Sequence, residues 1–385
     1  MIQRRKVLVV AMLDSIHTAR WLEQFTGQDI DFYLFPSSPH RRIHNQTKQL
    51  THSNYNAKFV VARGMGLLAL PLTVLDLVFK NQIRSRILRY IIDHSDAKFD
   101  IVHALETQHA GYMAEIALRN SRQKPLFLLS VWGSDLYWFK QFKNHIARIR
   151  RVLLSTHQLI LECTRDIQIA YEFGYTGKKP VLTPASGGFN VSAFELAAKS
   201  IQPSKRKMIL VKGYMGFVGR ADVALRVIEE MQNVLSGYSI VVYSTDVRSR
   251  RIIRRLQKKT TLKLLSYNKH QLDHTSMLEL FRNARMHIGI SESDGMPGSL
   301  REAMLSGCFP IQSNTSCADE WVADGIDGFV VSVEDIPRIK KAIQSAIENS
   351  ELIDIAAIRN REIAVSRLSS EKIQADIASL YKLQG

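Results

Sequence analysis

The sequence has 385 residues, of which 45% are hydrophobic and 23% charged, so it has the composition of a globular protein and not of a disordered one. At about 100–200 residues per domain, this length predicts two or three domains. The net charge is +16, and residues 1–200 are the more basic part, with 26 Lys and Arg against 15 Asp and Glu. This excess leaves nucleic acids, anionic membrane surfaces and anionic small substrates open as partners.

Short aliphatic and β-branched runs alternate with helical patterns along the whole chain. The predicted strands are Lys6–Leu13, Asp31–Phe35, Asp100–Leu105, Pro125–Trp132, Gln158–Cys163, Pro180–Ala185, Lys207–Tyr214, Tyr238–Thr245, Leu262–Ser266, Met286–Ser291, Phe309–Ser313 and Gly328–Val331. Most are continuous apolar runs, which is typical of strands buried on both faces of a parallel sheet. Helices are expected between them, for example at Ala221–Leu235. The pattern predicts an α/β protein with doubly wound, Rossmann-like domains.

The stretch Ser192–Arg206 is polar, contains Pro203 and lacks a strand, so it predicts a domain boundary. We expect one domain at residues 1–195 and a second at 196–370, with a cleft between them. Ligands of such sheets bind outside the carboxyl ends of the strands. A last helix, at about 371–383, is expected to pack back on the first domain.

One long apolar segment, Phe59–Phe79, is interrupted by Arg63, Pro71 and Asp76. Its longest clean piece is too short to span a membrane, which takes about 20 apolar residues. It therefore reads as a buried or interfacial segment. No signal peptide is expected either, because Val7–Leu13 reads as a strand.

Three cysteines with no C-x-x-C spacing argue against a disulfide scaffold or a zinc ribbon, and they favour a reducing compartment. Basic clusters occur at residues 4–6, 41–42, 148–151 and 248–255, and each reads first as a solvated surface. No zinc finger, RNP motif or aromatic-interleaved basic stretch accompanies them. No nucleic-acid partner is therefore predicted.

The most informative stretch is residues 291–313, which follow a predicted strand. It contains two acids eight residues apart, Asp294 and Glu302, and the loop glycines Gly295 and Gly298. A helix is expected from about Ser299 to the C-capping Gly307. A glycine-bearing loop at a helix start offers backbone N–H groups to a diphosphate. Alternatively, Ser299 and Glu302 form only a capping box, which contributes about 1 kcal/mol to helix stability.

This stretch resembles the signature of glycosyltransferase family 4, whose members are retaining nucleotide-sugar enzymes of the GT-B fold. The run EAMLSGCFP at 302–310 matches the family pattern, and Asp319–Val322 and Asp324–Val331 resemble its next two blocks. In the first half, the resemblance to bacterial polysaccharide-assembly members is carried by Ser15–Trp21, Val131–Asp135 and Pro184–Asn190.

The resemblance implies roles for individual residues. The family places an Arg and a Lys in the loop after the first strand of the second domain, which here contains Lys212 and Arg220 in the reversed order. Both would bind the donor diphosphate with Gly295, Gly298 and Ser299, as anions favour cations and helix starts. Glu302 would hold the ribose hydroxyls and Asp294 the sugar hydroxyls.

The sequence departs from the family at three places. Asp294 stands where Glu is usual, Trp132 stands where many relatives have His, and Met296-Pro297 replaces Phe-Gly, which removes one backbone donor. His17 and His109 follow first-domain strands and are predicted, with Asp294, as the catalytic set, although no proton-transfer role is assigned to either histidine. His103 lies within its strand and is expected to be buried.

The predicted function is transfer of a sugar from a nucleotide-diphosphate donor to a saccharide or lipid-linked saccharide in surface polysaccharide biosynthesis, with retention of configuration. No cofactor or metal is expected. The predicted location is cytoplasmic, with the basic first domain docking on an anionic inner membrane face. Three alternatives stay open: a nucleotide-sugar epimerase on the same fold, a non-catalytic nucleotide- or glycan-binding protein, and a nucleic-acid binder.

Overall fold

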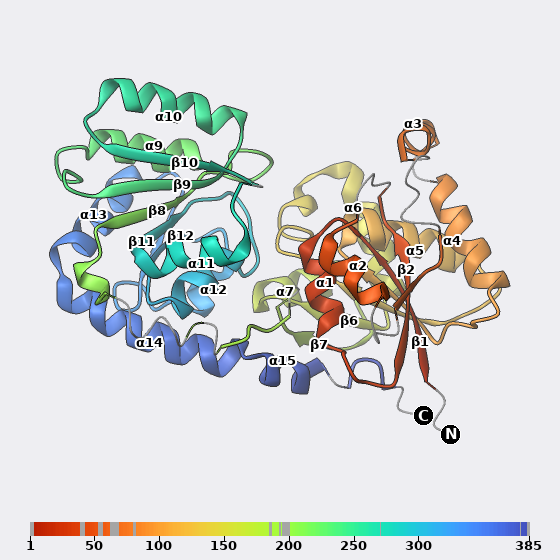
Figure 1. Cartoon of the computed structure of the whole chain (residues 1–385). Coiled ribbons are helices and arrows are strands. Elements are labelled where there is room, and N and C mark those ends of the chain that lie inside the picture. Colours follow the sequence, from red (N-terminus) through yellow and green to blue (C-terminus); the bar gives the residue numbers. More distant parts are fainter. Residues whose placement is uncertain are drawn as a thin grey trace. The chain divides into compact units, whose positions relative to one another are not determined.

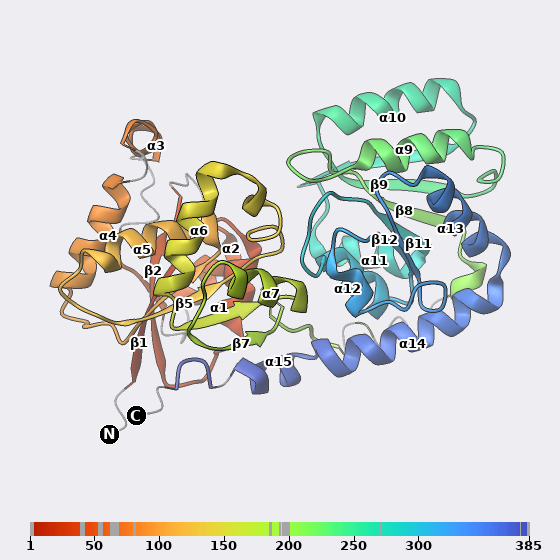
Figure 2. The same cartoon turned by 180° about the vertical axis from the view of Figure 1, so that it is seen from behind.

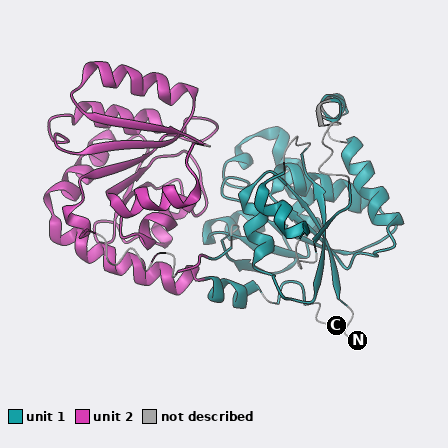
Figure 3. Ribbon diagram, viewed as in Figure 1, with its two compact units in different colours: residues 1–188, 370–385 teal, residues 189–369 magenta. Residues whose placement is uncertain are grey.

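The computed structural model describes residues 4–38, 43–52, 57–61, 69–79, 82–184, 187–191, 194, 201–269, 271–377 and 379–382. The chain forms two compact units (Figure 3). Unit 1 comprises residues 1–188 and 370–385, and unit 2 comprises residues 189–369. Much of the stretch 192–206, where the sequence predicts a boundary, lies outside the described residues.

Unit 1 is built on a parallel sheet in the order β3-β2-β1-β4-β5-β6-β7. The strands are β1 (Arg5–Ala11), β2 (Ile30–Pro36), β3 (Ala57–Phe59), β4 (Ile101–Leu105), β5 (Leu126–Ser130), β6 (Gln158–Leu161) and β7 (Lys178–Leu182). The central strand β4 is buried along its whole length, whereas the edge strand β7 is largely exposed. This explains why the central strands read as continuous apolar runs.

Helices cover both faces of this sheet (Figures 1 and 2). They are α1 (Ile16–Glu23), α2 (Asn45–His52), α3 (Ala69–Val78), α4 (Gln82–His94), α5 (Tyr112–Arg119), α6 (Lys143–Ser155), α7 (Thr164–Glu172) and α15 (Ser370–Ile377), with the short η2 (Thr107–Gly111) and η3 (Phe139–Gln141). Buried side chains of α4, α5 and α6 share one core cluster, and those of α1, α2 and α15 share another. The sheet is therefore doubly wound.

The C-terminal segment is fastened to unit 1 by a buried hydrogen-bond chain. The indole Nε1 of Trp21 donates to the Tyr381 hydroxyl at 3.0 Å, and that hydroxyl lies 2.7 Å from Nδ1 of His103. Nε2 of His103 is in turn 2.9 Å from the Ser130 hydroxyl. Burial lowers the pKa of His103 to about 3, so this histidine is neutral and structural, as the sequence indicated.

Unit 2 has a second parallel sheet in the order β10-β9-β8-β11-β12-β13. The strands are β8 (Met208–Lys212), β9 (Ser239–Thr245), β10 (Lys263–Asn268), β11 (Ala284–Gly289), β12 (Phe309–Ser313) and β13 (Phe329–Val331). The helices are α9 (Ala221–Glu230), α10 (Val247–Lys259), α11 (His274–Asn283), α12 (Gly298–Leu305), α13 (Ile336–Glu348) and α14 (Ser350–Leu368), with the short η5 (Pro203–Lys205) and η6 (Cys317–Glu320).

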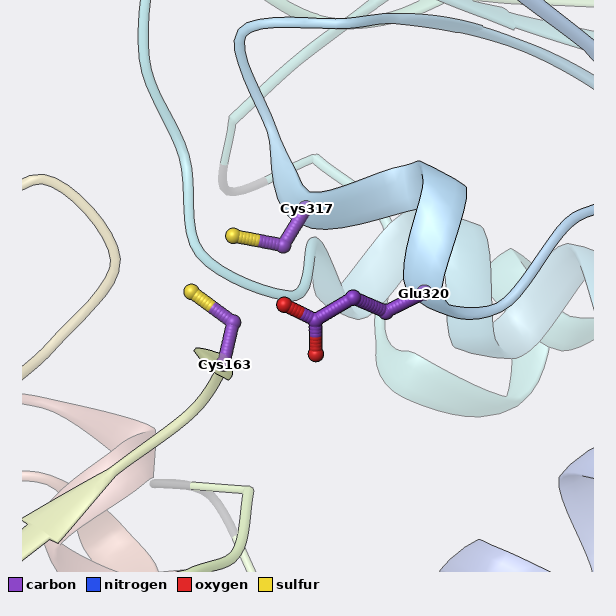
Figure 4. A group of neighbouring side chains, drawn as sticks. All are labelled: Cys163, Cys317 and Glu320. Carbon is purple, nitrogen blue, oxygen red and sulfur yellow. The ribbon is translucent and has the colours of Figure 1, made fainter. Parts of the chain in front are cut away.

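The two faces of this second sheet are covered by different helices. Those on one face, α9, α10 and α13, share one core cluster with the sheet, and α11 and α12 pack on the other face. The long α14 contributes to clusters at both of its ends. Beyond β12 the short η6 begins at Cys317 and ends at Glu320, as their labelled side chains show (Figure 4).

The sequence-based expectations are confirmed for the fold class and for all twelve predicted strands. The three-residue edge strand β3 was missed because it precedes the apolar segment 59–79 without a pattern of its own. The expected helix Ala221–Leu235 ends earlier, at Glu230. The helix expected at 371–383 is observed as Ser370–Ile377. Gly307 takes the left-handed conformation (φ +64°) expected after a helix end.

The apolar segment 59–79 is not a buried helix throughout. Residues 62–68 lie outside the described part, and the remainder forms α3, where Val74 and Val78 are 57% and 68% exposed. The buried interpretation is therefore wrong for these side chains, because α3 packs against α4 and leaves part of its surface uncovered. None of the helices in the described ranges is both long and apolar enough to cross a membrane.

Candidate active site

Two loops of unit 2 lie side by side at the carboxyl edge of the sheet. One joins β8 to α9 and the other joins β11 to α12. The Arg220 N–H donates to the Ile290 carbonyl at 3.0 Å, and the Glu292 N–H donates to the Val218 carbonyl at 2.7 Å. Because these bonds tie the loops together, residues 70 to 80 positions apart in the sequence share one site.

The β8–α9 loop depends on a glycine for its path. A Cβ on Gly219 would lie 2.2 Å from the carbonyl oxygen of Tyr214, far inside van der Waals contact. The backbone therefore turns back on itself here and brings Arg220 to the N-cap position of α9. This geometry explains why a glycine directly precedes Arg220 in the loop.

Arg220 is held by two carboxylates. Its Nε lies 3.0 Å from Oδ1 of Asp222, its Nη2 lies 3.0 Å from Oδ2 of the same residue, and its Nη1 bonds to Glu292. The hydrogen bonds that the guanidinium donates to Asp222, then those that it donates to Glu292, raise its pKa above the ordinary value. About one third of the side chain stays exposed, so a permanent positive charge faces solvent at this edge.

The second cation, Lys212, ends strand β8. Its Nζ lies 3.6 Å from Oδ2 of Asp294, and both side chains are 27% exposed. The other oxygen of Asp294 accepts a hydrogen bond at 2.9 Å from the N–H of Gly295. The structure thus brings Lys212, Asp294 and Gly295 together.

Helix α12 begins at Gly298 with Pro297 at its N-cap, and no side chain caps it among the residues described. The capping box expected from Ser299 and Glu302 is therefore wrong. Because Pro297 takes the N-cap, Ser299 lies inside the first turn of the helix. The N–H groups of the first turn have no partner within the helix and attract anions.

Glu302 is directed to a different partner. Its Oε1 lies 3.1 Å from Nε2 of His274, the first residue of α11, and its side chain is 14% exposed. An imidazole beside a carboxylate fixes the orientation of that carboxylate. His274 is thus a site residue that the sequence analysis missed, because nothing in the sequence links α11 to α12.

Tyr243 and His287 form a buried pair close enough to Lys212 to feel its charge. The Tyr243 hydroxyl is 2.9 Å from Nε2 of His287, and both residues are buried. Burial, followed by the charge of Lys212, lowers the pKa of His287 to about 3. The histidine is therefore neutral at physiological pH, and it adds no charge to the ion pairs of Lys212 and Arg220.

In unit 1, the two predicted histidines follow different strands of the first sheet. His17 lies in the first turn of α1 behind its N-cap Ser15, and its ring is 5.4 Å from that of Trp132. His109 is exposed and lies in η2, a π-helical turn after β4. Both occupy the carboxyl edge of the sheet, where ligands of parallel sheets bind.

Two buried carboxyl groups brace this edge, and the sequence analysis did not find them. Glu106 has a positive φ of 88° and accepts hydrogen bonds from the N–H groups of His109 and Ala110. Asp135 accepts from the N–H groups of Thr107 and Trp132 at 2.8 and 3.0 Å. Burial raises the pKa of both carboxyls, and the charge of Glu106 adds to the rise at Asp135.

Comparison with known proteins agrees with this arrangement. Residues 194–362 match the family of glycosyl transferases group 1, and residues 73–164 match the glycosyl transferase 4-like family. The capsular polysaccharide biosynthesis glycosyltransferase CapM of Staphylococcus aureus is 21% identical over 323 residues, which are 80% of this chain and 82% of CapM.

Solved structures share the fold over nearly the whole chain. HepE of Anabaena, in complex with UDP-glucose, matches with a TM-score of 0.71 at 14% identity, covering 98% of this chain and 100% of that one. A glycosyltransferase from Rickettsia africae matches with a TM-score of 0.69 at 14% identity, covering 98% of each chain. Two doubly wound units with parallel sheets define the GT-B fold that these structures share. The two family matches and the similarity to CapM indicate that the chain resembles the family 4-like glycosyltransferases of this class.

Proposed function

We propose that the protein transfers a sugar from a nucleoside-diphosphate sugar to a saccharide or lipid-linked saccharide during assembly of a surface polysaccharide. The observation that carries this proposal is the pairing of the two loops of unit 2, which places Lys212, Arg220 and the uncapped start of α12 at one sheet edge. The relatives support the same class, since CapM acts in capsular polysaccharide biosynthesis and HepE binds UDP-glucose.

The chemistry requires positive charge where the donor breaks. Cleavage of the bond between the anomeric carbon and the diphosphate leaves negative charge on the diphosphate oxygens. Arg220, Lys212 and the N–H groups of Gly298 and Ser299 would stabilise this charge as it develops. In the structure, Lys212 forms an ion pair with Asp294, and Arg220 forms one with Glu292. The diphosphate would therefore exchange with carboxylates that already hold the guanidinium and ammonium groups in place.

The acids of the site would bind the rest of the donor. Glu302, oriented by His274, would accept hydrogen bonds from the ribose hydroxyls. Asp294, once the diphosphate takes Lys212, would accept hydrogen bonds from hydroxyls of the transferred sugar. In this scheme Asp294 moves between two partners, and Gly295 keeps one of its oxygens fixed.

The remaining assignments are part of the same proposal. Transfer proceeds with retention of configuration. It needs no metal ion, because Arg220 and Lys212 supply the positive charge that a metal would supply. His17 and His109 contact the acceptor at the edge of the unit 1 sheet. The enzyme acts in the cytoplasm at the inner face of the cell membrane, which the +11 charge of residues 1–200 supports.

A thermal-shift screen with nucleoside diphosphates and their sugars tests the donor site. We expect one nucleotide series to raise the melting temperature and Arg220→Ala to abolish the rise. Arg226→Ala is the matched control, because Arg226 lies on the same helix in an exposed pair with Glu230. A response that survives Arg220→Ala but falls in Arg226→Ala would contradict the proposal. Turnover in excess EDTA tests metal independence, and product analysis with the acceptor present tests transfer and retention.

A further inference from the structure

Unit 1 contains a pocket of about 520 Å³ on the outer side of helices α4, α5 and α6. Five arginines line it: Arg86 and Arg89 from α4, Arg119 from α5, and Arg148 and Arg151 from α6. The i, i+3 spacing within α4 and within α6 places each pair on one helix face. The residues that line the pocket include no acid. The cluster 148–151, which the sequence analysis interpreted as a solvated surface, thus supplies two of the five arginines that line this cavity.

The positive charge of this pocket is poorly balanced by the protein. In the described part of the chain, Glu115 pairs with Arg119 at 3.5 Å, and no ion pair reaches Arg86, Arg89 or Arg151. Arg148 stacks over the Tyr112 ring at 4.0 Å, which fixes its position without neutralising it. Burial lowers the pKa of Arg148, Tyr112 and Glu115 act against this fall, and the charge of Arg151 adds to it. An anion in the pocket would relieve this repulsion.

The chemistry of the pocket selects phosphate groups. Guanidinium groups bind phosphate oxygens through two parallel N–H bonds, so several arginines around one cavity suit a phosphate better than a halide or a lone carboxylate. A volume of about 520 Å³ is large enough for a phosphorylated head group. The pocket belongs to unit 1 alone and is distinct from the donor site of unit 2.

Helix α3, which precedes α4 directly, indicates whether the phosphate belongs to a lipid or to a soluble molecule. Val74, Val78 and Phe79 are 57%, 68% and 51% exposed, and Leu75 is 41% exposed. Exposed apolar side chains gathered on one short helix are unusual on a soluble surface. Both views of the fold show α3 standing beyond α4 (Figures 1 and 2).

A buried ion pair fixes α3 to the helix that carries the pocket. Asp76 of α3 bonds to the guanidinium of Arg84, and both are almost fully buried. Arg84 also donates to the Ser37 carbonyl beside β2. Because Arg84 lies two residues before Arg86, the apolar side chains of α3 and the arginines of α4 keep a fixed relation.

We propose that the arginine pocket and α3 form one lipid-binding surface, in which the five arginines bind the phosphates of anionic lipids and Val74, Val78 and Phe79 enter the outer acyl region. Apolar side chains beside a cluster of basic residues are the combination that holds a helix in a membrane interface. The proposed function places the enzyme at the inner face of the membrane, and this inference names the residues that would bind that face. It does not depend on the donor site.

Vesicle sedimentation of the full chain tests the proposal. The vesicles contain phosphatidylcholine with or without phosphatidylglycerol. The wild type should bind the anionic vesicles and release them at high salt. Arg86→Gln with Arg89→Gln should weaken binding roughly 20-fold, since each basic residue near such a surface contributes roughly fivefold. Val78→Ser with Phe79→Ser should also weaken binding.

The matched controls remove the same chemistry from unit 2. Arg251→Gln with Arg254→Gln deletes an exposed i, i+3 arginine pair from α10, a basic helix without acidic residues. Val247→Ser with Ile358→Ser deletes two apolar side chains that are 56% and 62% exposed. Both controls should bind vesicles like the wild type. All variants should keep the thermal shift with the donor nucleotide, which separates this inference from the proposed function.

A calorimetric titration with inorganic pyrophosphate, in the Arg220→Ala background, distinguishes a lipid phosphate from a soluble one. Weak pyrophosphate binding that disappears with Arg86→Gln and Arg89→Gln, together with vesicle binding, supports the lipid surface. Pyrophosphate binding without vesicle binding would overturn it in favour of a soluble phosphate ester. A dimer that dissociates in Val78→Ser with Phe79→Ser and ignores vesicles would also overturn it. An equal loss of vesicle binding in the α10 control would overturn it as well, because the effect would then come from the overall charge of the protein and not from the arginine pocket.

Discussion

Arg220 and Glu292 form an ion pair that joins the start of α9 to the loop after β11. The pair matters for function because the same guanidinium is the principal candidate for binding the donor diphosphate. Glu292 lies in the quoted signature stretch, two residues before Asp294, yet no spacing rule pointed to it. Its contact holds Arg220 at the sheet edge where we propose that the diphosphate binds.

Glu292→Gln should tighten binding of nucleoside diphosphates by roughly two- to fivefold, because the diphosphate then displaces a neutral amide instead of a carboxylate. The gain is small since the pair is about one third exposed and Asp222 still holds Arg220. Isothermal titration calorimetry measures the change, and Glu230→Gln, an exposed acid at the end of α9, is the control. Weaker binding in Glu292→Gln would show instead that Glu292 contacts the ligand.

Gly219→Ala should lower both donor affinity and stability. The new methyl would stand 2.2 Å from the Tyr214 carbonyl, so the loop that presents Arg220 must shift. We expect the free energy of unfolding to fall by about 1–3 kcal/mol, as for other overpacked sites. Gly237→Ala is the control, because that glycine has a φ of +87° but open space around it. It should lose about 1 kcal/mol and keep normal donor binding.

The strands were predictable from sequence because parallel strands buried on both faces carry one unbroken apolar signal. Edge elements lack that signal, which is why Ala57–Phe59 was missed. The exposure of α3 was not predictable either, because its composition is that of a buried helix and only tertiary packing leaves Val74 and Val78 uncovered.

The site was predictable to the extent that its residues are close in sequence or carried by the family resemblance, as with Lys212, Arg220 and Asp294. Contacts made across the fold were not. His274 reaches Glu302 from a neighbouring helix, and the positive φ of Glu106 sets a π-helical turn that no local pattern indicates. The capping box failed because the N-cap is Pro297, two residues before the Ser299 that the pattern suggested.

The roles assigned to the two ends of the donor can be separated by ligand truncation. Glu302→Ala should weaken binding of a nucleoside diphosphate roughly tenfold and leave binding of inorganic pyrophosphate unchanged, because pyrophosphate has no ribose. Arg220→Ala should weaken both ligands. His274→Ala should resemble Glu302→Ala with a smaller effect, as it only orients the carboxylate. Competition titrations measure all six affinities. Equal losses for both ligands in Glu302→Ala would reject the ribose assignment.

The stability of the protein should fall as the pH decreases below neutrality, and His103 should account for part of the fall. Its pKa is lowered to about 3 in the folded protein, against about 6.5 in an unfolded chain. Between these two values the unfolded state binds the extra proton. The contribution is therefore fully present above pH 6.5 and decreases by about 3 kcal/mol by pH 4. Urea unfolding at several pH values measures this loss.

The variant His103→Gln isolates the effect. It should be less stable than the wild type at pH 7, because the hydrogen bonds to Tyr381 and Ser130 are disturbed, and the difference should shrink as the pH falls. His52→Gln, at an exposed position on α2, should follow the wild-type curve throughout. His287→Gln should behave like His103→Gln, since burial also lowers the pKa of His287 to about 3. Parallel curves for His103→Gln and the wild type would mean that His103 takes up its proton without unfolding, and that the chain of bonds from Trp21 to Ser130 tolerates a charge.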